Sequence, residues 1–201
     1  MTLQETKAQD TLRFAKRPAH ERGKADFGWL KSAHSFSFGQ YYDPRHLGFG
    51  NLIVINDDVV DGGKGFGAHP HKNAEIFSYV LGGALEHKDS MGNGSVVAEG
   101  GVQYMSAGSG VTHSEFNPSQ TEQMRFLQVW LLPEVENTKP AYDISHALPA
   151  GRKGWVQVAT GSVSVNSVPL DKGDGLAVEG SGTLIFDQGR DAEFLYFDLA
   201  P

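Results

Sequence analysis

The chain has 201 residues, a formal net charge of −7 at pH 7 and no cysteine. Its length suits one domain of about 200 residues or two smaller ones, and its composition excludes a chain that is disordered throughout. Without cysteine there is no disulfide and no thiolate metal ligand. The acidic balance argues against direct nucleic-acid binding, which requires a basic face. No apolar run is long enough for a membrane helix and no signal peptide is visible, so we expect a cytoplasmic protein.

Short runs of β-branched and aromatic residues alternate with glycine-containing turns along the chain. In chain order, the expected strands are residues 52–56, 76–81, 101–105, 124–132, 155–160, 162–165, 176–178, 183–187 and 194–199. Turns are expected at residues 57–67, 89–94, 161 and 188–191. Many short strands at this spacing indicate an all-β sandwich or barrel.

The chain divides into two halves of similar pattern. The segment GGALEHKDSMGNGSVVAEGG has a weaker counterpart in GSVSVNSVPLDKGDGLAVEG, and the proline-rich segment 133–149 lies between them. Seven of the eight histidines precede residue 114. We therefore expect residues 1–135 to form a lobe that carries the site. Residues 136–201 would supply the linker and a second lobe without metal ligands.

Two short motifs carry the reactive side chains. The first is Gly63-x5-His69-Pro70-His71-x3-Glu75-x6-Gly82, and the second is Gly110-x2-His113-Ser114-Glu115. Residues i and i+2 of a strand point to the same face, so each motif offers a pair of ligands. Two such pairs on facing strands would place three imidazoles and one carboxylate around a divalent transition metal. Such a set leaves positions open for water or substrate, as in a catalytic site.

The same motifs resemble the cupins and, more specifically, the pirin family. The first motif matches the first cupin motif at every fixed position, and the second motif matches only the latter part of its counterpart. The resemblance to pirins rests on residues 22–58, 69–93 (HPHKNAEIFSYVLGGALEHKDSMGN) and 105–117 (MSAGSGVTHSEFN). Within the family, the chain is most similar to bacterial pirin-like quercetin 2,3-dioxygenases.

The resemblance implies a bicupin fold, with two cupin-type barrels and one metal in the N-terminal lobe. Carried over residue by residue, the implied metal ligands are His69, His71, His113 and Glu115. Iron(II) is the expected metal, and nickel, manganese, cobalt, copper or zinc are the alternatives.

Several residues around this set remain open to more than one interpretation. In many cupins the residue at the position of Glu75 is a ligand, but here we favour Glu115 as the ligand. Glu75 would then not bind the metal and would orient a ligand imidazole. A pocket could be lined by aromatic side chains and one further histidine, namely His34, Phe36, Phe38 and Phe66. The other histidines, including His87, are interpreted as structural.

Three functions follow from this interpretation. The first is a dioxygenase that opens a small aromatic enolic substrate such as quercetin with O2 and releases carbon monoxide, with Glu115 as general base. The second is a metal-binding regulatory protein that acts through a protein partner, as described for eukaryotic pirins. The third is another cupin activity, such as an isomerase. We expect a monomer.

Overall fold

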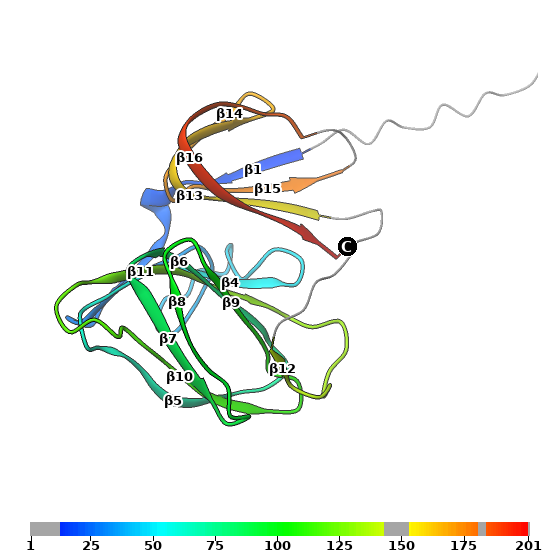
Figure 1. Ribbon diagram of the computed structural model, residues 1–201. Coiled ribbons are helices and arrows are strands. Elements are labelled where there is room, and N and C mark those ends of the chain that lie inside the picture. Colours follow the sequence, from blue (N-terminus) through cyan, green and yellow to red (C-terminus); the bar gives the residue numbers. More distant parts are fainter. Residues whose placement is uncertain (1–12, 143–152, 181–183, 201) are drawn as a thin grey trace, which may run out of the picture. The chain divides into compact units, whose positions relative to one another are not determined.

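The structure is a computed structural model that describes residues 13–142, 153–180 and 184–200. Its elements are β-strands and one short 3-10 helix, η1 (Ala19–Glu21), which confirms the expected all-β class (Figure 1). The chain separates into two units. The larger is Pro18–Ala147, and the smaller combines Met1–Arg17 with Leu148–Pro201. None of the described helices is long and apolar enough to cross a membrane.

The larger unit contains a seven-stranded and a four-stranded sheet, each antiparallel. In spatial order, the seven-stranded sheet consists of β12 (Ala141–Tyr142), β9 (Val102–Ser106), β6 (Glu75–Gly82), β11 (Met124–Leu131), β4 (Leu52–Val60), β3 (Leu30–His34) and β2 (Gly23–Asp26). The four-stranded sheet consists of β5 (Gly65–His71), β10 (Val111–Phe116), β7 (Ala84–Asp89) and β8 (Gly94–Ala98).

Apolar side chains from both sheets pack together between them. Val80 of β6 and Phe126 of β11 pack with Leu85 of β7 in one cluster. Met105 of β9 packs with Val111 of β10 in a second cluster. Full burial of such a side chain stabilises the fold by about 1.5–3 kcal/mol. These two clusters therefore hold the strands of the two motifs, β5 and β10, against the larger sheet.

The smaller unit is one five-stranded sheet. Its strands are β1 (Arg13–Arg17), β15 (Gly175–Glu179), β13 (Lys153–Val165) and β14 (Val168–Asp171), with β16 (Phe186–Leu199) also paired to β13 (Figure 1). Its core contains Val156, Leu170 and Leu176, with Phe14 and Phe194 packed against it.

The first strand of the chain belongs to this smaller unit. Arg13–Arg17 lies within residues 1–135, the range expected for the first lobe, but it pairs along its whole length with β15. Its pairing is long-range in sequence, and the short polar segment RFAKR gave no strand signal of its own. The proline-rich segment expected as a linker lies partly outside the described residues.

β4 is longer than expected because its acidic end is paired. The sequence predicts a turn from Asp57 onward, yet β4 continues to Val60. Asp57 forms ion pairs with Arg22, at 3.3 Å, and with Arg125 of the neighbouring strand, at 2.8 Å. Burial alone would raise the pKa of Asp57, but the hydrogen bond from Arg125 helps bring it below its ordinary value. Tertiary pairing thus overrides the low strand propensity of aspartate.

Two of the expected turns are bulges inside long strands. β13 continues through Gly161, whose φ is +63°, and β16 continues through Gln188 and Asp191, which also have positive φ. The pairing register of β13 with β16 shifts around Thr160. A side chain at Gly161 would lie 2.2 Å from the carbonyl oxygens of Arg190 and Asp191. Glycine here permits a bulge rather than a chain reversal.

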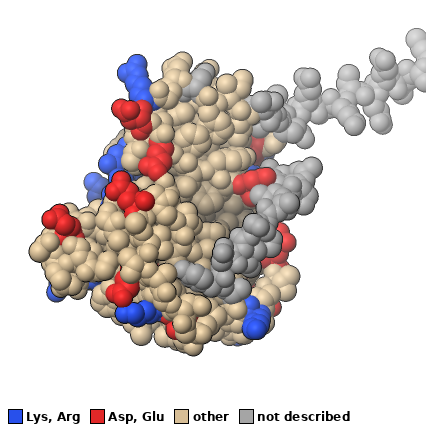
Figure 2. All heavy atoms as spheres, viewed as in Figure 1, with Lys and Arg blue, Asp and Glu red and all other residues tan. Residues whose placement is uncertain are grey.

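On the face that Figure 2 shows, Lys and Arg side chains lie interspersed with Asp and Glu, and most of the surface is uncharged.

Candidate metal centre

Three histidines from two paired strands converge inside the larger unit. His69 and His71 lie on β5, and His113 lies on β10 directly opposite His69. The ring centroids are 4.8 Å apart for His69 and His71, 4.5 Å for His69 and His113, and 4.8 Å for His71 and His113. One nitrogen of each ring lies within 4.8 Å of the other two. The period of two along a strand, predicted from the sequence, produces this arrangement.

The polar atoms of these rings are disposed for metal binding. His69 Nδ1 lies 2.7 Å from the carbonyl oxygen of Gly67, which can only accept a hydrogen bond. The neutral His69 ring therefore carries its proton on Nδ1 and keeps a lone pair on Nε2. His113 is 1% exposed, and its Nε2 has no hydrogen-bond partner among the described residues. Such an orphaned buried atom costs about 1–3 kcal/mol, which a bound cation would relieve.

The environment also favours the neutral rings of His71 and His113. Burial, together with the neighbouring His69 and His71, lowers the pKa of His113 to about 3. Burial lowers the pKa of His71 to about 4, with His69 adding to the effect. Only the neutral ring offers a lone pair to a metal. The residues present thus fit a divalent transition metal bound through nitrogen.

Glu115 lies beside His113 but belongs to a second cluster. Its carboxylate groups with His87 and His113, whose ligand atoms again lie within 4.8 Å of one another. The side chain is buried, and its two oxygens accept hydrogen bonds of 2.7 Å from Ser78 Oγ and Gln128 Nε2. Burial raises the pKa of Glu115, while these hydrogen bonds oppose the shift. The four expected ligands therefore form two overlapping groups that share His113.

Glu75 does not orient a ligand imidazole, contrary to the expectation from sequence. Its carboxylate accepts hydrogen bonds from Tyr104 Oη and from Ser106 Oγ, the latter at 2.9 Å. β5 ends at His71 and Asn73 has a φ of +50°, so the chain turns before β6 begins at Glu75. The turn breaks the strand parity that would have carried Glu75 to the face of the histidines.

His34 and Phe38, two of the residues predicted to line a pocket, are linked to His71 by a chain of aromatic contacts. Trp130 packs edge-on against His71, with ring centroids 4.8 Å apart. The ring centroid of Phe38 lies 5.5 Å from that of Trp130 and 5.6 Å from that of His34. His34 is buried, and its Nδ1 lies 2.7 Å from Asn56 Oδ1. Burial lowers the pKa of His34.

The other two are core residues. Phe36 is 3% exposed. Phe66 packs against Trp29, with ring centroids 5.6 Å apart, and lies 6.5 Å from Phe126. Both side chains contribute packing contacts to the larger unit.

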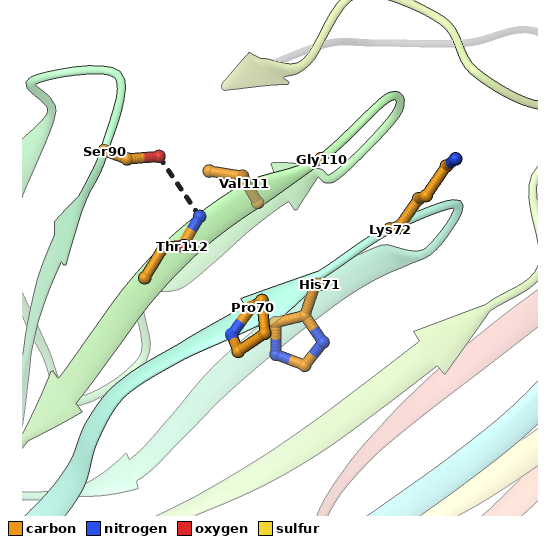
Figure 3. A pocket seen from close by; sticks show the side chains of 7 residues that line it. All are labelled: Pro70, His71, Lys72, Ser90, Gly110, Val111 and Thr112. Carbon is orange, nitrogen blue, oxygen red and sulfur yellow. Dashed lines mark hydrogen bonds between the residues drawn. The ribbon is translucent and has the colours of Figure 1, made fainter.

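An open pocket of about 410 Å³ lies beside His71, one of the three histidines. It is lined by Pro70, His71, Lys72, Ser90, Gly110, Val111 and Thr112. Figure 3 shows the His71 ring beside Pro70 on β5, with Val111 and Thr112 on the neighbouring β10, whereas the Lys72 side chain extends away. The backbone N–H of Thr112 donates to Ser90 Oγ at 3.1 Å. None of the four residues predicted to line a pocket lines this one, but its volume suits a small molecule.

Sequence reasoning missed two residues that contact the histidines. His87 was interpreted as structural, although the spacing His87-Lys88-Asp89 repeats the i, i+2 pattern used for the other pairs. Trp130 lies in a strand that is apolar on both faces, so no sequence signal distinguished it from the core.

Protein-family comparisons agree with this fold. The family model described as Pirin matches residues 15–131, and the model described as Quercetinase C-terminal cupin domain matches residues 135–199. The chain belongs to the pirin family. The resemblance noted in the sequence is thereby confirmed, as is the fold of two cupin domains.

Known pirins and related proteins are similar along nearly the whole chain. A protein of Escherichia coli named quercetin 2,3-dioxygenase is 40% identical, over 92% of this chain and 98% of the relative. The crystal structure of the bacterial pirin YhhW from Escherichia coli in complex with nickel(II) has a TM-score of 0.88 at 39% identity, covering 94% of this chain and all of that one. The structure of GK1651 from Geobacillus kaustophilus shares the fold, with a TM-score of 0.71 at 18% identity, over 96% of this chain and 98% of that one.

Proposed function

We propose that the chain is a metal-dependent dioxygenase that uses O2 to open the central ring of flavonols such as quercetin. The observation that carries this proposal is the convergence of His69, His71 and His113, with the buried Nε2 of His113 left without a partner. The Escherichia coli relative named quercetin 2,3-dioxygenase and the nickel(II) complex of YhhW support the same assignment.

His69, His71 and His113 would hold the metal, with Glu115 as the fourth ligand. A divalent metal bound there supplies Lewis-acid stabilisation of the deprotonated 3-hydroxyl of the substrate. Imidazole and carboxylate suit iron(II), which we expect, and also nickel, manganese, cobalt, copper and zinc.

Glu115 is also the proposed general base. Its burial raises its pKa, which favours the carboxylate as the acceptor of the 3-hydroxyl proton. Ser78 and Gln128 donate one hydrogen bond to each of its oxygens and so fix its orientation. In the overall reaction, the flavonol takes up both atoms of O2 and loses one carbon as carbon monoxide. No external reductant is required.

The pocket beside His71 would admit the substrate. Its wall combines the apolar surfaces of Pro70 and Val111 with the hydroxyls of Ser90 and Thr112. A flat polyhydroxylated aromatic molecule offers matching apolar faces and hydroxyl groups.

Turnover of quercetin by metal-loaded protein tests the proposal. We expect the visible absorbance of quercetin to fall in air, with one O2 consumed per molecule, and to stay constant without oxygen. His69→Ala and His113→Ala should abolish the reaction because each removes a ligand. Equal rates for these variants and the wild type would overturn the proposal.

Elemental analysis of protein purified without chelator identifies the metal independently of the substrate. We expect one metal per chain in the wild type and its loss in each ligand variant. The Glu75→Gln variant is the matched control, because Glu75 contacts Tyr104 and Ser106 instead of the centre. A metal content unchanged by His69→Ala, His71→Ala and His113→Ala would contradict the assigned ligands.

A further inference from the structure

A line of buried polar side chains extends from His113 away from His69 and His71. His113 Nδ1 lies 3.4 Å from His87 Nδ1, and His87 Nε2 lies 3.2 Å from Asp89 Oδ2. The side chains of His87 and Asp89 are both fully buried. They lie on β7, which pairs with β10 so that Asp89 is opposite His113 and His87 is opposite Glu115.

The carboxylate at the end of this line is firmly held by its own turn. Asp89 Oδ1 accepts the backbone N–H groups of Met91, at 2.9 Å, and Asn93, at 3.0 Å. Asp89 Oδ2 accepts a hydrogen bond from Asn93 Nδ2 at 2.9 Å. Both oxygens of Asp89 thus accept hydrogen bonds from donors of its own turn, which fixes the carboxylate as an oriented acceptor.

The donor and the acceptor of each hydrogen bond can then be assigned in turn, from Asp89 to His87 and from His87 to His113. A carboxylate can only accept, so Nε2 of His87 must donate to Asp89. When the His87 ring carries a single proton, on Nε2, its Nδ1 is an acceptor, and the 3.4 Å contact is then a hydrogen bond donated by Nδ1 of His113. His113 then carries its proton on Nδ1, and its lone pair lies on Nε2. This is the same nitrogen that is buried without a partner.

We propose that Asp89 and His87 are positioning residues that fix the tautomer of His113, so that its Nε2 lone pair faces His69 and His71 before any metal arrives. This inference rests on the proposed metal centre. His69 reaches the same tautomer through the Gly67 carbonyl, whereas His113 requires two further side chains. Outer partners of this kind set the orientation and basicity of a ligand ring.

The tautomer itself is measurable without metal. In metal-free protein labelled with 15N-histidine, long-range 1H–15N correlation spectra should show His113 protonated on Nδ1 and His87 protonated on Nε2. Asp89→Asn places an amide donor within reach of His87, so it should shift His113 towards the form protonated on Nε2. A wild-type His113 protonated on Nε2 would overturn the inference.

Nickel affinity provides the second measurement, by competition of Ni2+ against a chelator. His87→Leu removes the acceptor and should weaken binding about 10–100-fold, as is usual for outer partners of metal ligands. His87→Asn keeps an oxygen close to the position of Nδ1, so it should bind Ni2+ much more tightly than His87→Leu. Equal weakening in both variants would overturn the positioning role and would indicate His87 as a ligand in its own right.

The two measurements separate this inference from the proposed function. If the wild type shows the expected tautomers but binds no Ni2+, the metal centre is wrong and the tautomer assignment stands. If Ni2+ binds with unchanged affinity in His87→Leu, the metal centre stands and the positioning role is wrong. Near-ultraviolet circular dichroism of the metal-free variants confirms their fold. Should His87→Leu fail to fold, Asp89→Asn provides both readouts.

Discussion

At the scale of single residues, Asp58 is the clearest source of pH dependence. Its side chain is buried on β4, and its Oδ1 has no hydrogen-bond partner among the described residues. Burial raises the pKa of Asp58 to about 7, against a hydrogen bond from Ser32, and the charges of Asp57 and Glu115 add to the rise. The folded protein therefore binds this proton more tightly than the unfolded chain does.

The sign of the effect follows from linkage. Because the folded pKa lies above the unfolded value, the contribution of Asp58 to the stability of metal-free protein should fall as the pH rises from about 4 to 7 and then level off. Asp58→Asn removes this titration. At about 1.4 kcal/mol per pKa unit, its stability relative to the wild type should rise by roughly 2–3 kcal/mol between pH 5 and pH 8.

Urea unfolding of both proteins at the two pH values measures this difference. Asp61→Asn is the matched control, since Asp61 follows the same strand but is not buried. A constant difference between Asp58→Asn and the wild type would contradict a raised pKa.

The three histidines of the cluster could be predicted from the sequence, because strand geometry alone brings them together. His69, His71 and His113 follow from the period of two and the pairing of two strands. The interior partners do not, because Ser78, Gln128 and His87 come from three other strands whose registers no local pattern specifies. Glu75 was misplaced because the turn at Asn73 depends on one left-handed residue.

At the scale of elements, the approach of β5 to β10 depends on Gly65. An added Cβ there would lie 2.3 Å from the carbonyl oxygen of Glu115 and 2.5 Å from Cα of Phe116. The pairing register of β5 with β10 shifts between His113 and Glu115. The close approach at Gly65 therefore lies next to this irregularity, which separates two of the proposed metal ligands.

Gly65→Ala should therefore push the two strands apart. We expect a loss of about 1–3 kcal/mol of stability, as for an overpacked core, together with weaker Ni2+ binding. Gly67→Ala is the matched control on the same strand, since a Cβ there meets nothing within 4 Å. Thermal unfolding and chelator competition measure both effects. Two variants of equal stability and affinity would show that this contact is not limiting.

Strand positions were more predictable than strand ends. The expected strands at residues 52–56, 76–81, 101–105 and 124–132 correspond to β4, β6, β9 and β11, because each is a compact apolar run. The ends depend on partners distant in sequence. Arg22 and Arg125 extend β4 beyond Asn56, and the bulge at Gly161 keeps β13 and β16 continuous where glycine and aspartate indicated turns.

At the scale of the whole molecule, the two units have separate cores. Leu176 is fully buried in the core of the smaller unit, and the described residues that could hold a metal all lie in the larger one. Leu176→Ala should cost about 2–5 kcal/mol in the unfolding of the smaller unit. Its Ni2+ affinity should equal that of the wild type.

Fluorescence of Trp155, which is buried on β13, reports on the smaller unit once Trp29 and Trp130 are replaced by Phe in both proteins. The matched variant is Phe126→Ala, which opens a cavity in the larger unit and should lower Ni2+ affinity. A loss of Ni2+ binding in Leu176→Ala comparable to that in Phe126→Ala would show that the two cores are coupled.

The pairing of β5 with β10 also determines when in folding a metal can be captured. Four strands, β6 to β9, separate them in the chain, so until β5 and β10 pair, His69 and His71 are near each other in the chain but His113 is not held beside them. Closing so long a loop comes late, because its entropy must be offset by packing already in place. At the proposed centre, a metal would therefore bind after these strands have paired and would come from the surroundings of the folded protein. Iron(II) ranks below nickel and copper in intrinsic affinity, so the proposed centre would fill with iron only where those ions are scarce.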